Sequence, residues 1–214
     1  GMHLSSHSSY VDPEQVIQYV EAHDNLTLYD KLLRSNPNDS EEVRIKRHTL
    51  ATSIILLAQG VPFVHGGQEF LRTKEGVANS YKSSDEINQF EWERVTTFQK
   101  SVAYVKGLIA LRKREYLFRM HTLDEIDAHF TTLSENFNIV AFALQNEWKK
   151  YIVVFNANRS ATIFRMQKGK YAILVEDNQV LLDRKAEASA MEKILVKAHT
   201  TTVLYAENQN NNDF

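Results

Sequence analysis

Hydrophobic positions along the chain follow two different periods, and the change of period divides the sequence into two parts. Up to about residue 118, two segments with apolar residues at helical spacing alternate with two short β-branched runs. From about residue 127 the apolar residues occur in short segments separated by turn residues. The order β-α-β-α followed by strands alone predicts an α/β part and then a separate, smaller β-domain.

In the first part, Val16–Val20 is predicted to form a buried strand, and Thr27–Leu33 a short helix. The spacing of Asp39 and Glu42 is typical of a capping box at the start of a long helix. Its apolar face is expected at helical spacing, at Val43, Arg47, Leu50, Ile54 and Leu57.

Gly60 and Pro62 end this helix, with Gly60 expected as a left-handed C-cap. Val61–Val64 is then predicted as a very short strand, and residues 72–90 as an irregular loop. A second long helix is predicted from Phe98 to Leu111, although Gly107 inside it costs about 1 kcal/mol relative to alanine.

The second part has the regular punctuation of an antiparallel β-sandwich. Asn156–Asn158 and Lys168–Lys170 are expected to be turns. Six strands are predicted, at Ile139–Leu144, Tyr151–Phe155, Ala161–Met166, Tyr171–Val175, Ile194–Val196 and Thr200–Tyr205.

Composition narrows the classes of partner. The 214 residues include 43% hydrophobic residues, carry a formal net charge of −2 and contain no cysteine. The lack of a basic excess argues against a nucleic-acid partner, and the lack of cysteine excludes disulfides and thiolate metal sites. The longest apolar run, Ile54–Ala58, is far shorter than the roughly 20 residues that span a bilayer, so no membrane partner is expected.

Gly1–Met2 is typical of a residue left by tag cleavage before the start of the expressed segment, so the chain is expected to begin inside a longer gene product. The C-terminal end shows no cell-wall sorting signal and no membrane anchor, which favours the cytoplasm. The expected division is a lead-in at 1–12, an α/β part at 13–118, a β-domain at 119–207 and a polar tail at 208–214.

Polar motifs follow both predicted strands of the first part. His23-Asp24-Asn25 comes after the first strand, and Gly66-Gly67-Gln68-Glu69 after the second. Two strands, each followed by a helix, make about a quarter of a (β/α)8 barrel, a fold in which functional groups gather at the carboxyl ends of the strands. The first part is therefore predicted to be the last two βα units of a partial barrel.

Three longer runs then resemble type I pullulanases, members of the α-amylase superfamily of glycoside hydrolases. They are Tyr19–Leu32, Gln59–Lys74 and Asn79–Asn88, in that order. In the second run alanine is commoner at the position of Gly66, a small change that affects no catalytic group. The resemblance implies a C-terminal portion of an enzyme that hydrolyses α-1,6-glucosidic linkages of pullulan, starch or glycogen-type glucans by a retaining mechanism.

The resemblance also implies roles for single residues. Asp24 matches the carboxylate that stabilises the transition state, and His23 a histidine that donates to hydroxyls of the same sugar. Asn25 is expected to orient the loop or neighbouring subsites. Asn79, Tyr81 and Asp85 are expected to line glucose subsites, unless their loop is only a solvated connector. No cofactor is implied, although calcium could bind the parent enzyme.

Retaining hydrolysis needs two carboxyl groups about 5 Å apart, a nucleophile and an acid/base. In the superfamily these lie on barrel strands that this chain lacks, so the chain alone is expected to be inactive, and its truncated barrel to self-associate. Two alternatives remain: a portion of an isoamylase or another α-amylase-superfamily enzyme, or a non-catalytic glucan-binding module.

Other candidates are weaker. His65 is equally compatible with packing and with hydrogen bonding below the site. Trp92 and Trp148 could be sugar platforms, but their positions favour ordinary packing or exposure. The histidines lack i, i+4 spacing, so no metal site is expected.

Overall fold

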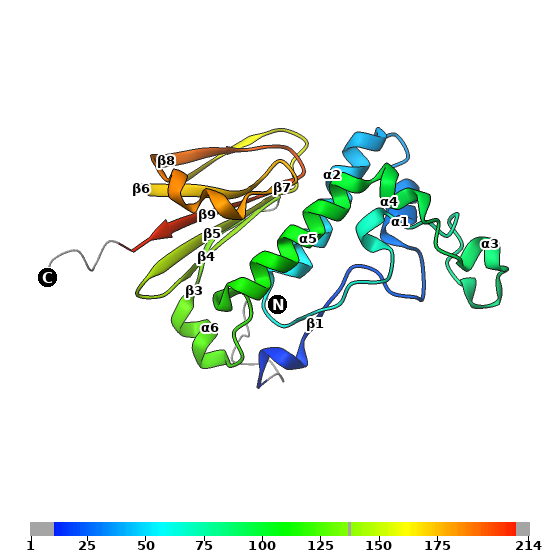
Figure 1. Cartoon of the computed structure of the whole chain (residues 1–214), viewed down its shortest axis with the longest axis horizontal. Coiled ribbons are helices and arrows are strands. Elements are labelled where there is room, and N and C mark those ends of the chain that lie inside the picture. Colours follow the sequence, from blue (N-terminus) through cyan, green and yellow to red (C-terminus); the bar gives the residue numbers. More distant parts are fainter. Residues whose placement is uncertain (1–10, 137, 209–214) are drawn as a thin grey trace, which may run out of the picture.

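The computed structural model describes residues 11–136 and 138–208, so the expected lead-in and polar tail lie almost entirely outside the described residues. Figure 1 shows two long helices, α2 (Glu41–Leu57) and α5 (Gln99–Arg114), lying between a β-domain at one end and a set of short helices and loops at the other. Among the described residues, no helix has the length and apolar character needed to cross a membrane.

The two predicted strands of the first part exist, but they are shorter than expected. After a turn of 3-10 helix at Pro13–Gln15, β1 (Ile17–Gln18) runs parallel to β2 (Val61–Pro62). The pair is extended by one bond, in which the Phe63 amide donates to the Gln18 carbonyl at 2.9 Å. The pairing brings the segments that follow both strands to the same end of this small sheet.

Helix α1 (Leu28–Ser35) begins at Thr27, whose hydroxyl accepts from the Asp30 amide. The cap expected for α2 at Asp39 was wrong: the Ser40 hydroxyl accepts from the Val43 amide instead. The Asp39 carboxylate pairs with Arg47 at 2.6 Å. A hydroxyl one residue later reaches the free amide of the first turn, which leaves the carboxylate for the ion pair.

The buried side of α2 also differs from the expected one. Ile54 is 42% exposed, whereas Arg44, His48 and Thr52 are buried. The helix ends at Leu57 with Ala58 as its C-cap, so the prediction of Gly60 as the cap was wrong; Gly60 is left-handed (φ +91°) in the turn to β2. A Cβ on Gly60 would lie 2.6 Å from the Val16 carbonyl oxygen, so the close approach to the first strand needs a glycine.

Between β2 and α5 the chain contains four short helical segments, and two of them lie within residues 72–90, where an irregular loop was predicted. These two are the 3-10 turn Ser80–Lys82 and α3 (Asp85–Asn88); the others are the 3-10 turn Gln68–Phe70 and α4 (Glu93–Thr97). Figure 1 shows α3 projecting from this end of the molecule.

One buried arginine joins the end of α2 to the end of α5. The Arg112 guanidinium donates to the carbonyl oxygens of Leu56, Ala58, Gly60 and Phe118, at 2.6 to 3.1 Å. Phe118 lies in the 3-10 turn Tyr116–Phe118 that follows α5. These carbonyls lie at the end of α2 and in turns, where regular secondary structure provides no backbone donor. The Arg112 guanidinium supplies the hydrogen-bond donors instead.

A further helix, α6 (Leu123–His129), was not predicted and leads into the β-domain. The domain is an antiparallel sheet in the order β3-β4-β5-β9-β6-β7, with β8 paired to β6. The strands are β3 (Phe130–Asn136), β4 (Ile139–Gln145), β5 (Lys149–Asn156), β6 (Thr162–Glu176), β7 (Gln179–Val180), β8 (Ser189–Val196) and β9 (Thr200–Glu207), with a 3-10 segment at Leu182–Glu187.

The turn predicted at Lys168–Lys170 was wrong, because the two strands predicted around it form one long strand, β6, from Thr162 to Glu176. The register of β6 against β8 shifts between Arg165 and Gly169. Such an irregularity bends a strand. Residues 162–171 of β6 pair with β8 on both sides of this shift, and residues 172–175 pair with β9.

Two apolar clusters hold these layers together. One lies between α2, α5 and one face of the sheet and includes Leu57, Leu108, Tyr151 and Leu174. The other lies on the opposite face, between the sheet and the β6–β8 pair, and includes Ile152, Val196 and Leu204. An antiparallel sheet buried on both faces matches the predicted β-sandwich.

Candidate functional site

His23 and Asp24 lie in the loop that follows β1, and both side chains face solvent. The imidazole Nε2 is 3.5 Å from an Asp24 carboxylate oxygen, and the side chains are 82% and 81% exposed. Asn25 has φ +66°, a left-handed conformation that asparagine tolerates better than most residues, and its side-chain oxygen accepts from the Leu26 amide. The loop thus presents an acceptor and an imidazole together on an open surface.

The buried Glu21 side chain anchors the loop that carries His23 and Asp24, which we call the His23 loop. Its carboxylate is buried and accepts hydrogen bonds from the Leu28 amide, at the start of α1, and from His65 Nδ1 at 3.2 Å. His65 follows β2, so this one carboxylate joins the segments after both strands. Glu21 holds the two ends of the loop together and is too buried to contact a substrate.

The Lys74 side chain anchors the same loop to the segment that follows β2. Its ammonium donates to the His23 carbonyl oxygen at 3.1 Å and to the Ser80 hydroxyl at 2.8 Å. The Asp30 carboxylate accepts from the Thr73 hydroxyl and the Lys74 amide, which anchors this segment to α1. Burial and the charge of Arg72 lower the pKa of Lys74, while nearby carboxylates oppose that shift.

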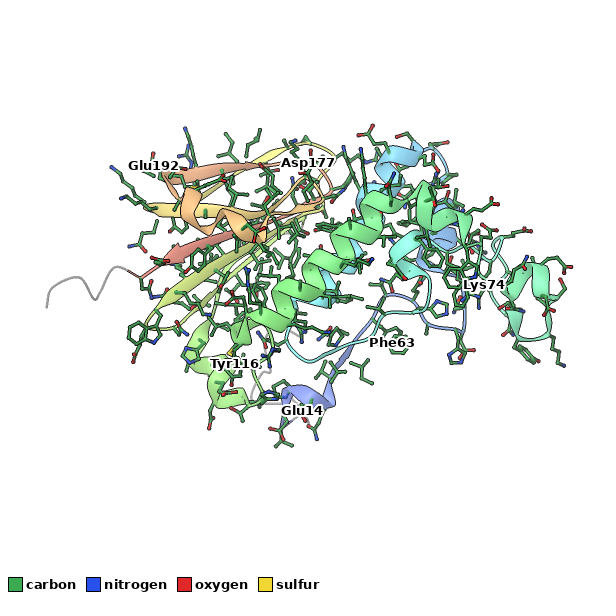
Figure 2. All side chains as sticks on the ribbon, in the orientation of Figure 1. Glu14, Phe63, Lys74, Tyr116, Asp177 and Glu192 are labelled. Carbon is green, nitrogen blue, oxygen red and sulfur yellow. The ribbon has the colours of Figure 1, made fainter. Side chains whose placement is uncertain are left out.

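The same ammonium joins the two regions that were predicted to contact sugar. Because Ser80 lies between Asn79 and Tyr81, its bond to Lys74 brings these residues beside the His23 loop. The Asn79 side chain is exposed, and Tyr81 is 74% exposed. Figure 2 shows Lys74 at the end of the fold that carries α1, α3 and α4.

Asp85 lies farther out, as the first residue of α3. Its side chain is exposed, and within residues 11–136 and 138–208 no hydrogen bond or ion pair joins it to the His23 loop. The structure therefore brings Asn79 and Tyr81 to the loop more directly than Asp85.

A second layer of polar side chains lies beneath Glu21. The Gln68 amide accepts from the His65 backbone and donates to the Thr52 hydroxyl at 2.9 Å, and Thr52 donates to the His48 carbonyl. Burial lowers the pKa of His48 to about 4, so its ring is neutral, and its Nε2 has no partner among the described residues. The layer links α2 to the base of the loop.

The arrangement can bind and orient hydroxyl groups. Asp24 can accept hydrogen bonds from two hydroxyls, and His23 can donate one. No cluster of three metal-ligating side chains occurs in the described parts of the chain.

Sequence reasoning missed Glu21, Asp30 and Lys74 as parts of this site. All three lie inside the runs that carried the resemblance, so their positions were available. The signal would have been an acidic residue between strand and loop, and a lysine that ends the second run. The pairing of these residues across more than 40 positions is visible only in the fold.

Comparison with known proteins supports the resemblance. A family model described as "Pullulanase, all-beta domain" matches residues 126–179, from α6 to β7. The pullulanase of Bacillus subtilis (strain 168) is 44% identical over 160 residues, which are 72% of this chain and 22% of that protein.

Solved structures agree over more of the chain. A pullulanase from Bacillus acidopullulyticus is 38% identical, with a TM-score of 0.87, and the match covers 92% of this chain and 25% of that one. A type I pullulanase from Bacillus subtilis, solved with maltose, is 38% identical with a TM-score of 0.85, over 92% of this chain and 28% of that one. In sequence and in fold, this chain is a relative of the pullulanases and spans about a quarter of their length.

Proposed function

We propose that this chain is the C-terminal portion of a debranching glycoside hydrolase of the pullulanase type. The observation that carries the proposal is the exposed His23–Asp24 pair, held from below by Glu21 and from the side by Lys74. The parallel pairing of β1 and β2, each followed by a helix, supports their assignment as two barrel strands.

In this proposal the Asp24 carboxylate accepts hydrogen bonds from sugar hydroxyls, and His23 donates to the same sugar. Hydroxyl contacts that tighten as the ring flattens toward an oxocarbenium ion lower the barrier, because they are stronger in the transition state than in the ground state. Asn25, Asn79, Tyr81 and Asp85 line the neighbouring glucose subsites. The nucleophile and the acid/base come from parts of the enzyme outside this chain.

The most direct test is a chimaera in which residues 11–208 replace the matching segment of the Bacillus subtilis pullulanase. We expect the chimaera to release reducing sugar from pullulan, and Asp24→Asn to lower its kcat by about 100-fold or more, as for loss of one transition-state contact. Asp124→Asn is the matched control, since Asp124 is an exposed carboxylate in α6, outside the proposed site, and it should leave kcat unchanged. Equal activity of a folded chimaera that carries the Asp24→Asn substitution would refute the role of Asp24.

The isolated chain is proposed to be inactive. Purified chain incubated with pullulan should release no reducing sugar, and clear turnover would contradict the assignment. The isoamylase alternative is separated by product analysis of the chimaera on pullulan and on glycogen. The match to the pullulanase family model and the long pullulanase-like runs favour pullulan over glycogen as the substrate.

A further inference from the structure

The β-domain carries a groove that the proposed catalytic role does not use. Two neighbouring hollows, of about 540 and 490 Å3, share Gln145 and Asn208 in their walls. Each falls within the usual size range of small-molecule sites, and the shared residues place both at one end of the sheet, so we call the two together the groove. This end is formed by the β4–β5 turn and the end of β9, whereas α1 and α3 lie at the other end of the molecule (Figure 1).

An exposed tryptophan directly follows two residues of the groove wall in the sequence, Asn146 and Glu147. Trp148 is in the β4–β5 turn, and its side chain is 62% exposed. Its backbone amide donates to the Asn146 side chain at 3.0 Å, and its carbonyl accepts from the Asn208 amide at 2.9 Å. Both asparagines line the groove. The turn is therefore fixed on both sides of Trp148, while its indole ring remains open to solvent.

The groove wall is rich in amides that are already held in place. The Asn146 side chain accepts from Trp148 and Lys149, and the Asn208 side chain donates to the Asn146 carbonyl. The Gln145 side chain has no hydrogen bond to any described residue, and so remains available to a ligand. Amides both donate and accept, which suits hydroxyl groups that also do both.

The charge of the hollow beside the β4–β5 turn argues against an ionic ligand there. Among its lining residues Glu147 is the one carboxylate, and none is a lysine or arginine. The lysines Lys150, Lys168 and Lys170 line the other hollow, together with Glu207. A flat apolar ring beside hydroxyl-binding amides fits an uncharged sugar, whose C–H face packs on the indole while its hydroxyls bind the amides.

We propose that the groove at the β4–β5 turn is a second binding site for a linear α-glucan, with Trp148 stacking on one glucose ring. The choice of an α-glucan rests on the proposed function; the choice of a neutral sugar rests on the groove itself. Such a site would hold the polysaccharide on the β-domain while a branch point is engaged elsewhere.

The test is calorimetric titration of the whole chain with maltoheptaose. We expect saturable binding, with the Kd raised at least 10-fold by Trp148→Ala and less than 3-fold by Trp148→Phe, which keeps a flat ring. Trp92→Ala is the matched control, because Trp92 is similarly exposed (67%) but contacts Phe70 and Phe90 at the other end of the fold. Its Kd should equal that of the unchanged chain.

Three results would overturn the proposal: no saturable binding by the unchanged chain, equal binding by the folded Trp148→Ala variant, or loss of binding in Asp24→Asn instead. The last result would place the glucan at the His23 loop and would support the proposed function. The opposite combination is binding that depends on Trp148 together with a folded chimaera that has no activity. It would support the binding site at the groove and refute the proposed function.

Discussion

The Lys74 ammonium donates to the backbone carbonyl of His23 across 3.1 Å, although 51 positions separate the two residues. Its second bond, to Ser80, continues the connection to the Asn79–Tyr81 segment. A charge so deeply buried is costly unless it is hydrogen bonded, and the nearby carboxylates, Glu21 first and then Asp24 and Asp30, favour it. Lys74 therefore serves to position the two loops relative to each other.

Replacing Lys74 by methionine should loosen both loops. A hydrogen bond to a charged group contributes about 1.5–3 kcal/mol, so we expect the free energy of unfolding to fall by about 2 kcal/mol. Urea unfolding measures that loss. Hydrogen exchange should show faster exchange of the amides of residues 22–26. Lys82→Met is the control, because Lys82 is exposed beside Tyr81, and it should change neither quantity.

His48 should make stability depend on acidity. Its pKa is lowered from 6.5 to about 4 by burial; the Glu21 carboxylate raises it and Arg94 lowers it further. Between these pH values the unfolded chain binds the proton that the folded chain excludes, so stability falls as the pH drops from about 6.5 to about 4. A shift of this size corresponds to about 3 kcal/mol.

Urea unfolding at about pH 7 and about pH 4.5 tests this contribution of His48. The loss of stability between the two pH values should be smaller by about 2 kcal/mol in His48→Gln than in the unchanged chain. His121→Gln removes an exposed imidazole paired with Glu14 and serves as the control. An identical pH dependence in His48→Gln and in the unchanged chain would show that the buried ring does not exclude the proton.

Local pattern predicted the order of elements well, because helical and strand-like periods depend on nearby residues. The errors arose where a distant partner decides the outcome. Lys168–Lys170 has the composition of a turn, yet Gly169 and Lys170 themselves pair with β8, which keeps β6 continuous. Likewise, exposed His23 and Asp24 lie in a recognisable motif, whereas buried Glu21 and Lys74 depend on partners that only the fold brings near.

Gly107 in α5 is another position where local sequence alone gives the wrong expectation, because a distant residue lies against it. Propensity alone predicts that alanine there would stabilise α5 by about 1 kcal/mol. In the fold, however, a Cβ on Gly107 would lie 2.6 Å from Cβ of Val180 in β7. Forcing extra volume into such a contact costs about 1–3 kcal/mol, so Gly107→Ala should be neutral to destabilising by about 2 kcal/mol.

A double-mutant cycle isolates that contact. In a Val180→Gly background, which removes Cβ and both methyl groups of Val180, the added methyl group has room, and Gly107→Ala should then stabilise the chain by up to about 1 kcal/mol. Thermal or urea unfolding of the four proteins gives the coupling between the two positions. Equal effects of Gly107→Ala in both backgrounds would mean that Val180 does not restrict the helix.

The β1–β2 pair leaves an apolar surface without cover, which we call the β1–β2 face: Ile17 and Tyr19 are each 59% exposed, and Val61 and Phe63 each 42%. Figure 2 shows Phe63 on the side of the pair away from α2 and α5, and its ring meets that of Tyr19 edge-on at 6.3 Å. Contiguous apolar groups of this kind favour association.

The chain alone should therefore self-associate through the β1–β2 face. Sedimentation velocity should show a mass that rises with concentration, and the double variant Tyr19→Ser/Phe63→Ser should shift the distribution toward monomer because it removes both exposed rings. Tyr81→Ser is the control, since Tyr81 is even more exposed (74%) but lies on another segment, the 3-10 turn Ser80–Lys82. A chain that stays monomeric at every concentration and binds no hydrophobic dye would contradict this prediction, because the exposed rings would then have neither a partner nor access to a probe.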